Sequence, residues 1–133
     1  MEAAAREPKI IIFSIGDNDS YRVPLEQFEN NLVELIKKAK AYTDKILFVG
    51  IKEVDEQKTK PVPWDENAFY TNDKIEVYNN KLKEVVERNG VVYLSLADVI
   101  TADDLNDGLH PNEQGHEKIF NAVRGFLRGD GWL

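Results

Sequence analysis

The segment IIIFSIGDND, residues 10–19, is an apolar run that ends in a glycine followed by three polar residues. It predicts a buried β-strand and then a tight polar turn, because β-branched residues favour strands and Asn and Asp favour turns. Two further runs, residues 46–51 and 91–94, are also rich in β-branched residues. None of the three alternates polar and apolar residues, which is typical of a parallel sheet covered on both faces. We therefore expect three buried parallel strands, with Ser14 in the core.

Three helical patterns separate or follow these runs. The first repeats apolar residues at steps of three and four over residues 25–39, directly after a proline that favours a helix start. The second covers residues 75–85 and is closed by Asn89-Gly90, a typical helix C-cap. The third covers residues 111–129 and begins with a proline. The order strand, helix, strand, helix, strand, helix predicts an α/β fold with right-handed crossovers.

A three-layer α/β sandwich with a short parallel sheet is therefore the expected architecture. The length of 133 residues predicts a single domain, residues 1–133, in which residues 1–8 form a flexible, charged lead-in. Ligands of such sheets bind outside the carboxyl ends of the strands. Residues 16–19 follow the first strand, so they are expected at this edge.

The segment DGLHPN, residues 107–112, is the second informative motif. It places a carboxylate three residues before a histidine and a proline directly after it, in a turn just ahead of a helix. Asp107 can accept a hydrogen bond from the Nδ1–H of His110, so that Nε2 acts as a general base. His116 lies six residues further along, about 240° around a helix of 3.6 residues per turn. We expect His116 to pack within the helix layer rather than to join the site.

Together the two motifs resemble the SGNH (GDSL-type) hydrolase family of esterases, lipases and acylhydrolases. Residues 16–19 are similar to the third block of that family, whose Asn donates an N–H to the oxyanion hole. Residues 107–110 are similar to its fifth block, which supplies the catalytic Asp and His. The resemblance extends from about Pro8 to the end of the last helical pattern. It implies that Asp107 and His110 are catalytic, that Asn18 is an oxyanion donor, and that Gly16 and Asp19 shape its turn.

The family also has a Gly-Asp-Ser block that carries the nucleophile on its first strand, and residues 1–8 do not contain one. The family's sheet has five parallel strands in the order 2-1-3-4-5. The chain is therefore expected to correspond to strands 3-4-5, a truncated flavodoxin-like SGNH fold. The chain has three serines, Ser14, Ser20 and Ser95, and none has the sequence context of an activated nucleophile. Ser20 is the nearest to the expected site.

These features imply a serine ester hydrolase of small ester or acylated substrates, with little or no activity in this chain alone. The alternative is a non-catalytic binding or self-assembling α/β module derived from the same fold. An apolar edge strand pairs readily with another copy. We therefore expect a homo-oligomer built around residues 9–15.

A long connection, residues 52–69, contains two prolines and two large aromatic residues. Long loops at the carboxyl edge often shape a substrate pocket. Trp64 is a candidate for such a role, and packing onto the neighbouring helices is the equally open alternative. Phe69 is expected to pack onto the helices.

The remaining features of the composition limit the kinds of partner and cofactor that we expect. There are 17 Lys and Arg against 24 Asp and Glu, which gives a net charge of −7 without a long basic run. This balance argues against nucleic acid and anionic membranes as partners. No cysteine is present, the spacing of residues 103–114 does not fit a calcium loop, and no cofactor or metal is expected. Because residues 1–6 lack a signal-peptide core, we expect a cytoplasmic location.

Overall fold

A computed structural model of the chain describes residues 9–133, so the expected lead-in, residues 1–8, lies outside the described residues. Three parallel strands, β1 (Ile11–Ser14), β2 (Ile46–Val49) and β3 (Val92–Leu94), form one sheet in the order β1-β2-β3. Phe13 pairs with Phe48, which in turn pairs with Tyr93. The parallel α/β architecture expected from the apolar runs is thereby confirmed.

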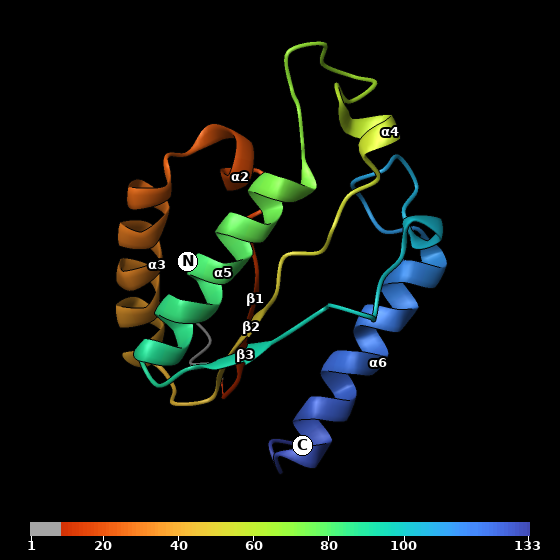
Figure 1. Cartoon of the computed structure of the whole chain (residues 1–133). Coiled ribbons are helices and arrows are strands. Elements are labelled where there is room, and N and C mark those ends of the chain that lie inside the picture. Colours follow the sequence, from red (N-terminus) through yellow and green to blue (C-terminus); the bar gives the residue numbers. More distant parts are fainter. Residues whose placement is uncertain (1–8) are drawn as a thin grey trace.

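Two long helices, α3 (Leu25–Lys40) and α5 (Asn72–Arg88), lie together on one side of the sheet (Figure 1). Between them and the sheet lies the main hydrophobic core. Its members are buried apolar side chains of α3, β2 and α5, among them Phe28, Leu32, Ile36, Ile46, Phe48, Ile75, Leu82 and Val85. This burial gives the sheet its principal stabilising layer.

The last helix, α6 (Glu113–Gly129), lies on the other side of the strands (Figure 1). Leu47 and Val49 are buried but do not belong to the core formed with α3 and α5, as expected for side chains on the opposite face of β2. The helix begins later than its Pro111 suggested. Asn112 is the N-cap, and its side chain accepts a hydrogen bond from the N–H of Gly115 at 2.9 Å.

Three short helical segments occupy the connections: α2 (Asp19–Arg22), α4 (Glu56–Thr59) and the 3₁₀ turn η1 (Ala102–Asp104). They stand after β1, after β2 and after β3, respectively. The helices of residues 9–133 include none that is both long enough and apolar enough to span a bilayer.

The strands differ in burial. Every residue of β2 is buried, whereas β1 alternates, with Ile12 44% exposed and Ser14 exposed as well. All three residues of β3 are half-buried, so the expectation of three buried strands holds for β2 alone. The expectation that Ser14 lies in the core is also wrong. Within the described residues β1 pairs with β2 alone, so it is an edge strand and only one of its faces meets the main core.

Candidate active site

The turn after β1 brings Asn18 to the carboxyl edge of the sheet. It depends on Gly16, which is buried and has φ +115°, a conformation that residues with a Cβ rarely adopt. A Cβ at this position would also stand 2.5 Å from Cδ1 of Ile51, so the turn packs closely against the segment after β2. Asp19 is the first residue of α2.

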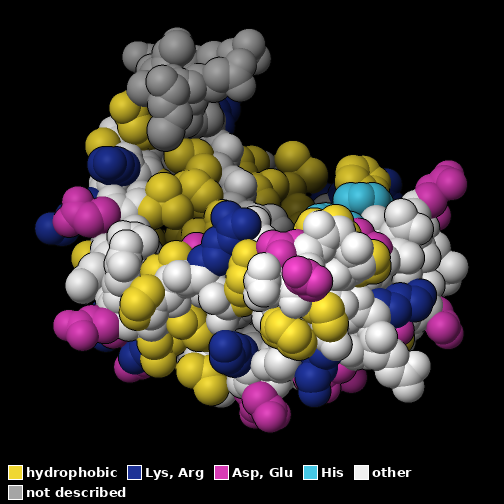
Figure 2. Space-filling view, turned by 90° about the horizontal axis from the view of Figure 1, so that it is seen from above, with side chains coloured by type: hydrophobic (Ala, Val, Ile, Leu, Met, Phe, Trp, Pro, Cys, Tyr) yellow, Lys and Arg dark blue, Asp and Glu magenta, His cyan; other side chains and the backbone are white. Residues whose placement is uncertain are grey.

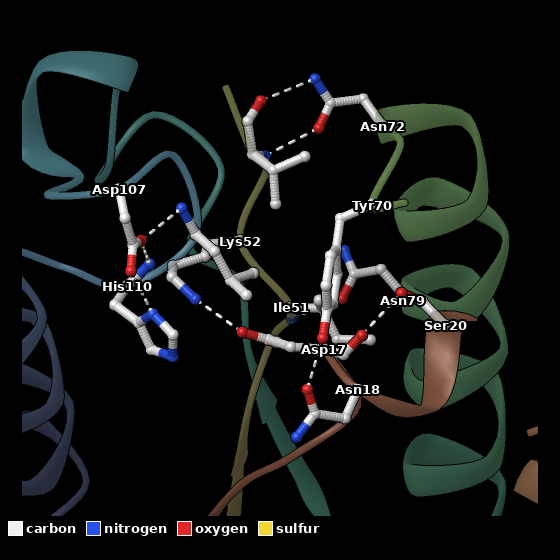
Figure 3. A network of polar contacts seen from close by, with 12 residues as sticks. Asp17, Asn18, Ser20, Ile51, Lys52, Tyr70, Asn72, Asn79, Asp107 and His110 are labelled. Carbon is white, nitrogen blue, oxygen red and sulfur yellow. Dashed lines mark hydrogen bonds and ion pairs between the residues drawn. The ribbon is translucent and has the colours of Figure 1, made fainter. Parts of the chain in front are cut away.

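Asp107 and His110 form a hydrogen-bonded pair in the loop before α6. The Oδ2 of Asp107 lies 2.7 Å from the Nδ1 of His110, and its Oδ1 accepts the backbone N–H groups of Leu109 at 3.0 Å and His110 at 2.7 Å. The carboxylate thus holds both the imidazole and the loop that carries it. Figure 3 shows the second ring nitrogen of His110 on the side of the ring away from Asp107.

The charge state of Asp107 suits this role. Burial by itself raises the pKa of Asp107, but the hydrogen bonds from the N–H and imidazole of His110 and from Leu109 outweigh it. The net effect is a pKa below the usual value of a carboxyl. Asp107 is therefore an acceptor near neutral pH. With Nδ1 of a neutral His110 as the donor, Nε2 carries the lone pair of the imidazole.

The loop itself is anchored at two places. Gly108, at φ +88°, accepts a hydrogen bond from the N–H of Asp55 at 2.9 Å, just before α4. On the other side the carbonyl of Asp104 accepts the N–H of Asn112 at 2.8 Å. Asp104 is fully buried, and its Oδ2 accepts from the N–H of Thr101 and from Nζ of Lys118, both at 2.9 Å. The position of His110 therefore depends on Asp55, on the segment between β3 and α6, and on Lys118 of α6.

Asn18 presents its carboxamide at the same edge. It occupies the N-cap position of α2, but its side chain accepts no hydrogen bond from the first N–H groups of that helix. Asn18 therefore does not cap α2 in the usual way. Its Oδ1 accepts instead from the hydroxyl of Tyr70 at 2.7 Å. Figure 3 shows the amide nitrogen directed away from Tyr70.

Two residues that the sequence did not single out complete this edge. Lys52, three residues after β2, lies with its Nζ 2.6 Å from the Oδ2 of Asp17, and its side chain is only 10% exposed (Figure 3). Tyr70 reaches Asn18 from the segment before α5. Lys52 and Tyr70 stand at the two ends of a long connection without a periodic pattern, so only the folded arrangement identifies them.

Neither Ser20 nor Ser95 is hydrogen-bonded to His110, although Ser20 belongs to the same turn as Asn18. Ser20, the expected nearest one, is 3% exposed, and its hydroxyl donates to the carbonyl of Asp17 at 2.7 Å. The Oγ of Ser95 accepts the N–H of Ala97. Over residues 9–133, the hydrogen bonds of the His110 side chain include none to a serine.

Trp64 stands beside the histidine. Its ring centroid lies 5.7 Å from that of His110 at an interplanar angle of 40°, and its side chain is 55% exposed. Seen from above, the molecule is hollowed, and a histidine (cyan) lies at the rim next to apolar side chains (Figure 2).

Two expectations about side-chain packing are wrong. Phe69 is 45% exposed rather than packed onto the helices, and His116 is exposed on α6 rather than packed within the helix layer.

Two cavities lie close to the site without including the pair Asp107 and His110. One, of about 410 Å³, lies between α2 and α5 and is lined by Ser20 and Tyr21 among others. The second, of about 430 Å³, is lined by Lys52 and by residues of α5 and the segment after β3. Within residues 9–133, His, Asp and Glu side chains form no group of three or more that could hold a metal ion.

The chain is similar to known ester hydrolases. It is 28% identical over 132 residues to a multidomain esterase of Ruminococcus flavefaciens, covering 91% of this chain and 16% of that protein. It is 26% identical over 137 residues to the isoamyl acetate-hydrolyzing esterase of Saccharomyces cerevisiae, covering 90% of this chain and 57% of that protein. The solved lipase/acylhydrolase of Enterococcus faecalis has the same fold, with a TM-score of 0.80 at 18% identity over 97% of this chain and 66% of that one.

The chain thus spans less than two thirds of each of these proteins. Residues 2–118 match the GDSL-like lipase/acylhydrolase family, and this range contains both the turn of Asn18 and the loop of Asp107 and His110. Because the match covers most of the 133 residues and agrees with the parallel α/β fold, the chain belongs to the GDSL-like lipase/acylhydrolase family.

Proposed function

We propose that this chain carries the base and the oxyanion donor of a serine-type ester hydrolase. His110 is the general base, Asp107 orients its imidazole, and Asn18 donates an N–H to the developing oxyanion. The observation that carries the proposal is the 2.7 Å hydrogen bond between Asp107 and the Nδ1 of His110, which leaves Nε2 free at the edge where Asn18 presents its amide.

In the proposed reaction Nε2 of His110 takes the proton of a serine hydroxyl while the serine oxygen attacks the ester carbonyl. The carbonyl oxygen becomes an oxyanion that accepts from Asn18, and Asp107 stabilises the imidazolium. The alkoxide leaving group then receives the proton from His110, which forms an acyl-serine and an alcohol. Water, activated by the same histidine, hydrolyses the acyl-serine.

Within residues 9–133, no serine hydroxyl is hydrogen-bonded to His110, so the described residues do not identify the serine of this reaction. We therefore propose that the chain alone is at most a weak hydrolase, acting through water activated by His110. Sites that lose a triad residue keep a residual acceleration of about 10³–10⁴ over water. This chain is expected to fall below that range, because Asn18 is the one oxyanion donor proposed within residues 9–133.

We further propose a small ester as substrate, in line with the acetate ester named for the yeast relative. Trp64 is proposed to form a wall of the substrate site, because its exposed ring lies against the imidazole. An aromatic face beside the base can cover the apolar part of an ester while leaving its carbonyl near Asn18.

Hydrolysis of p-nitrophenyl acetate tests the proposal. His110→Ala and Asn18→Ala are expected to remove most of the rate above buffer background. His116→Ala is the matched control, because this second histidine is exposed on α6 and a surface imidazole can cleave activated esters without any site. Equal rates in the wild type, His110→Ala and Asn18→Ala would exclude catalysis at this site.

A non-catalytic, self-assembling module is the second proposal, supported by the exposed Ile12 on the edge strand β1. Association of copies through β1 would cover both this side chain and the strand edge. Sedimentation velocity over a concentration series tests it. Ile12→Lys should abolish association, whereas Val77→Lys, which adds the same charge at a similarly exposed position on α5, should not. A monomer at all concentrations would exclude this proposal.

A further inference from the structure

Tyr70 and Asn18 are 52 residues apart in the chain, yet the Tyr70 hydroxyl donates to the Oδ1 of Asn18 at 2.7 Å. Figure 3 shows the phenol reaching the carboxamide from the side opposite to its nitrogen. We infer that Tyr70 is a positioning residue that fixes the carboxamide of Asn18 so that its N–H₂ faces the substrate. This inference rests on the proposed role of Asn18 as the oxyanion donor.

Tyr70 is suited to this task because it is itself firmly held. Its side chain is buried, its backbone N–H donates to the carbonyl of Thr59 at 3.0 Å, and its own carbonyl accepts from the Thr59 hydroxyl at 2.8 Å. Thr59 is fully buried. The ring of Tyr70 also packs against that of Tyr21, with centroids 5.0 Å apart. The phenol oxygen therefore has a well-defined position.

The direction of the hydrogen bond decides which end of the carboxamide is free. Burial and the neighbouring Tyr21 raise the pKa of Tyr70, so its hydroxyl keeps its proton at neutral pH. A reversed carboxamide would donate to the phenol oxygen and take this acceptor away from the phenol proton, which costs free energy at a partly buried hydroxyl. In residues 9–133, Asn18 Oδ1 is the acceptor that this hydroxyl meets.

The backbone of the same turn is held by other groups. Asp17 forms an ion pair with Lys52 at 2.6 Å, and its carbonyl accepts from the Ser20 hydroxyl at 2.7 Å. Removing the Tyr70 hydroxyl therefore leaves the turn in place and frees the rotation of one side chain. The expected effect falls on kcat rather than on KM, because an oxyanion donor acts mainly in the transition state.

Tyr70→Phe tests the inference, with Tyr93→Phe as its matched control. Tyr93 makes the same type of hydrogen bond, from its hydroxyl to the Oδ1 of Asn79 at 2.8 Å, so both variants lose one Tyr–Asn hydrogen bond and keep the ring. Loss of a whole oxyanion donor typically costs about 10²–10³ in turnover, and a misoriented donor is expected to cost about tenfold. Tyr70→Phe should therefore lower kcat for p-nitrophenyl acetate about tenfold, and Tyr93→Phe should not.

A double variant separates positioning from general stability. In an Asn18→Ala background the Tyr70→Phe change should have no further effect on kcat, because the group that Tyr70 positions is gone. Additive losses would overturn the inference. The same holds if Tyr70→Phe and Tyr93→Phe lower kcat equally.

A second readout does not depend on catalysis. In ¹⁵N-labelled protein, the side-chain amide signals of Asn18 can be assigned by their absence in Asn18→Ala. Tyr70→Phe should shift these signals, and Tyr93→Phe should leave them in place. Unchanged Asn18 signals in Tyr70→Phe would overturn the inference whether or not the chain hydrolyses esters. If they shift while the wild type shows no hydrolysis that depends on His110, the positioning holds and the proposed function fails.

Discussion

Nζ of Lys118 on α6 lies 2.9 Å from Oδ2 of Asp104, a carboxylate with no exposed surface that also receives the N–H of Thr101. This pair joins the last helix to the segment that leads into the loop of His110. The second oxygen of Asp104 has no hydrogen-bond partner within the described residues. All hydrogen bonds to the Asp104 side chain therefore reach Oδ2. Because the bond from Lys118 is an ion pair, protonation of Asp104 would weaken the link between α6 and the loop.

The stability of the fold should depend on Asp104 in acid. The hydrogen bonds from Lys118 and from Thr101 lower the pKa of Asp104 below its unfolded value of about 3.9. A carboxyl whose folded pKa is depressed stabilises the fold above the unfolded pKa, and this contribution is lost as the pH falls through the folded pKa. Asp104→Asn should be less stable than the wild type at pH 7 and should lose less stability between pH 6 and 3.

Urea unfolding at several pH values, followed by tryptophan fluorescence, measures this effect. Asp103→Asn is the control, because the neighbouring Asp103 side chain is exposed. It should retain the acid dependence of the wild type. If Asp104→Asn also retained the full acid dependence of the wild type, the ion pair of Asp104 with Lys118 would not be the source of that dependence.

Substitutions at two glycines should have opposite effects. Gly16→Ala places a Cβ at φ +115° against Ile51, and backbone strain of this kind costs about 1–3 kcal/mol. Gly125 lies inside α6 with open space where a Cβ would stand, so Gly125→Ala should stabilise the protein by about 1 kcal/mol. Thermal unfolding of the two variants and the wild type measures both changes in stability. A Gly16→Ala protein as stable as the Gly125→Ala protein would show that the backbone at position 16 is not strained by a Cβ.

His110 should hold down the pKa of Asp107. In His110→Ala the side-chain hydrogen bond and the imidazole charge are lost, while burial still opposes ionisation. The pKa of the Asp107 carboxyl is therefore expected to rise. Carbon-13 NMR of the Asp107 carboxyl over a pH series measures it, and His116→Ala should leave the midpoint unchanged. A midpoint that stays the same in His110→Ala would mean that the backbone N–H groups, and not the imidazole, lower the pKa of Asp107 against the effect of burial.

Trp64→Ala should weaken substrate binding. The ring of Trp64 lies beside that of His110, with centroids 5.7 Å apart, and is proposed above to form a wall of the substrate site. Its loss is therefore expected to remove apolar contact with the substrate and to raise KM more than it lowers kcat. Burial of a large apolar contact contributes about 1–3 kcal/mol, so an increase of roughly tenfold in KM is expected. Trp132→Ala is the control, because Trp132 packs on Phe126 near the end of the chain. Equal KM values in Trp64→Ala and the wild type would remove Trp64 from the substrate site.

The sequence patterns predicted the elements well and their surroundings less well. Apolar runs and steps of three and four located β1 to β3 and the three long helices, because these signals are local. Exposure was harder to predict. Ser14 and Phe69 are exposed, because burial depends on which neighbours the fold brings to each face.

Prediction of the candidate site has the same limit. Asp107 and His110 are three residues apart, so their hydrogen bond could be anticipated from spacing alone. The contacts of Asn18 with Tyr70 and of Asp17 with Lys52 span 52 and 35 residues. They depend on the course of the connection after β2, which has no periodic pattern. Single-sequence reasoning has no access to such long-range pairs.

The ion pair of Asp17 and Lys52 continues the alignment of the strands beyond the sheet. Ser14 and Val49 are the last paired residues of β1 and β2, and Asp17 and Lys52 each follow three positions later. Inserting or deleting one residue in either short segment would separate the two charges and displace Asn18. The longer segment that follows Lys52 carries no such constraint from the sheet. Variation in length among natural or engineered versions of this protein should therefore concentrate after Lys52 and be absent between the strands and this pair.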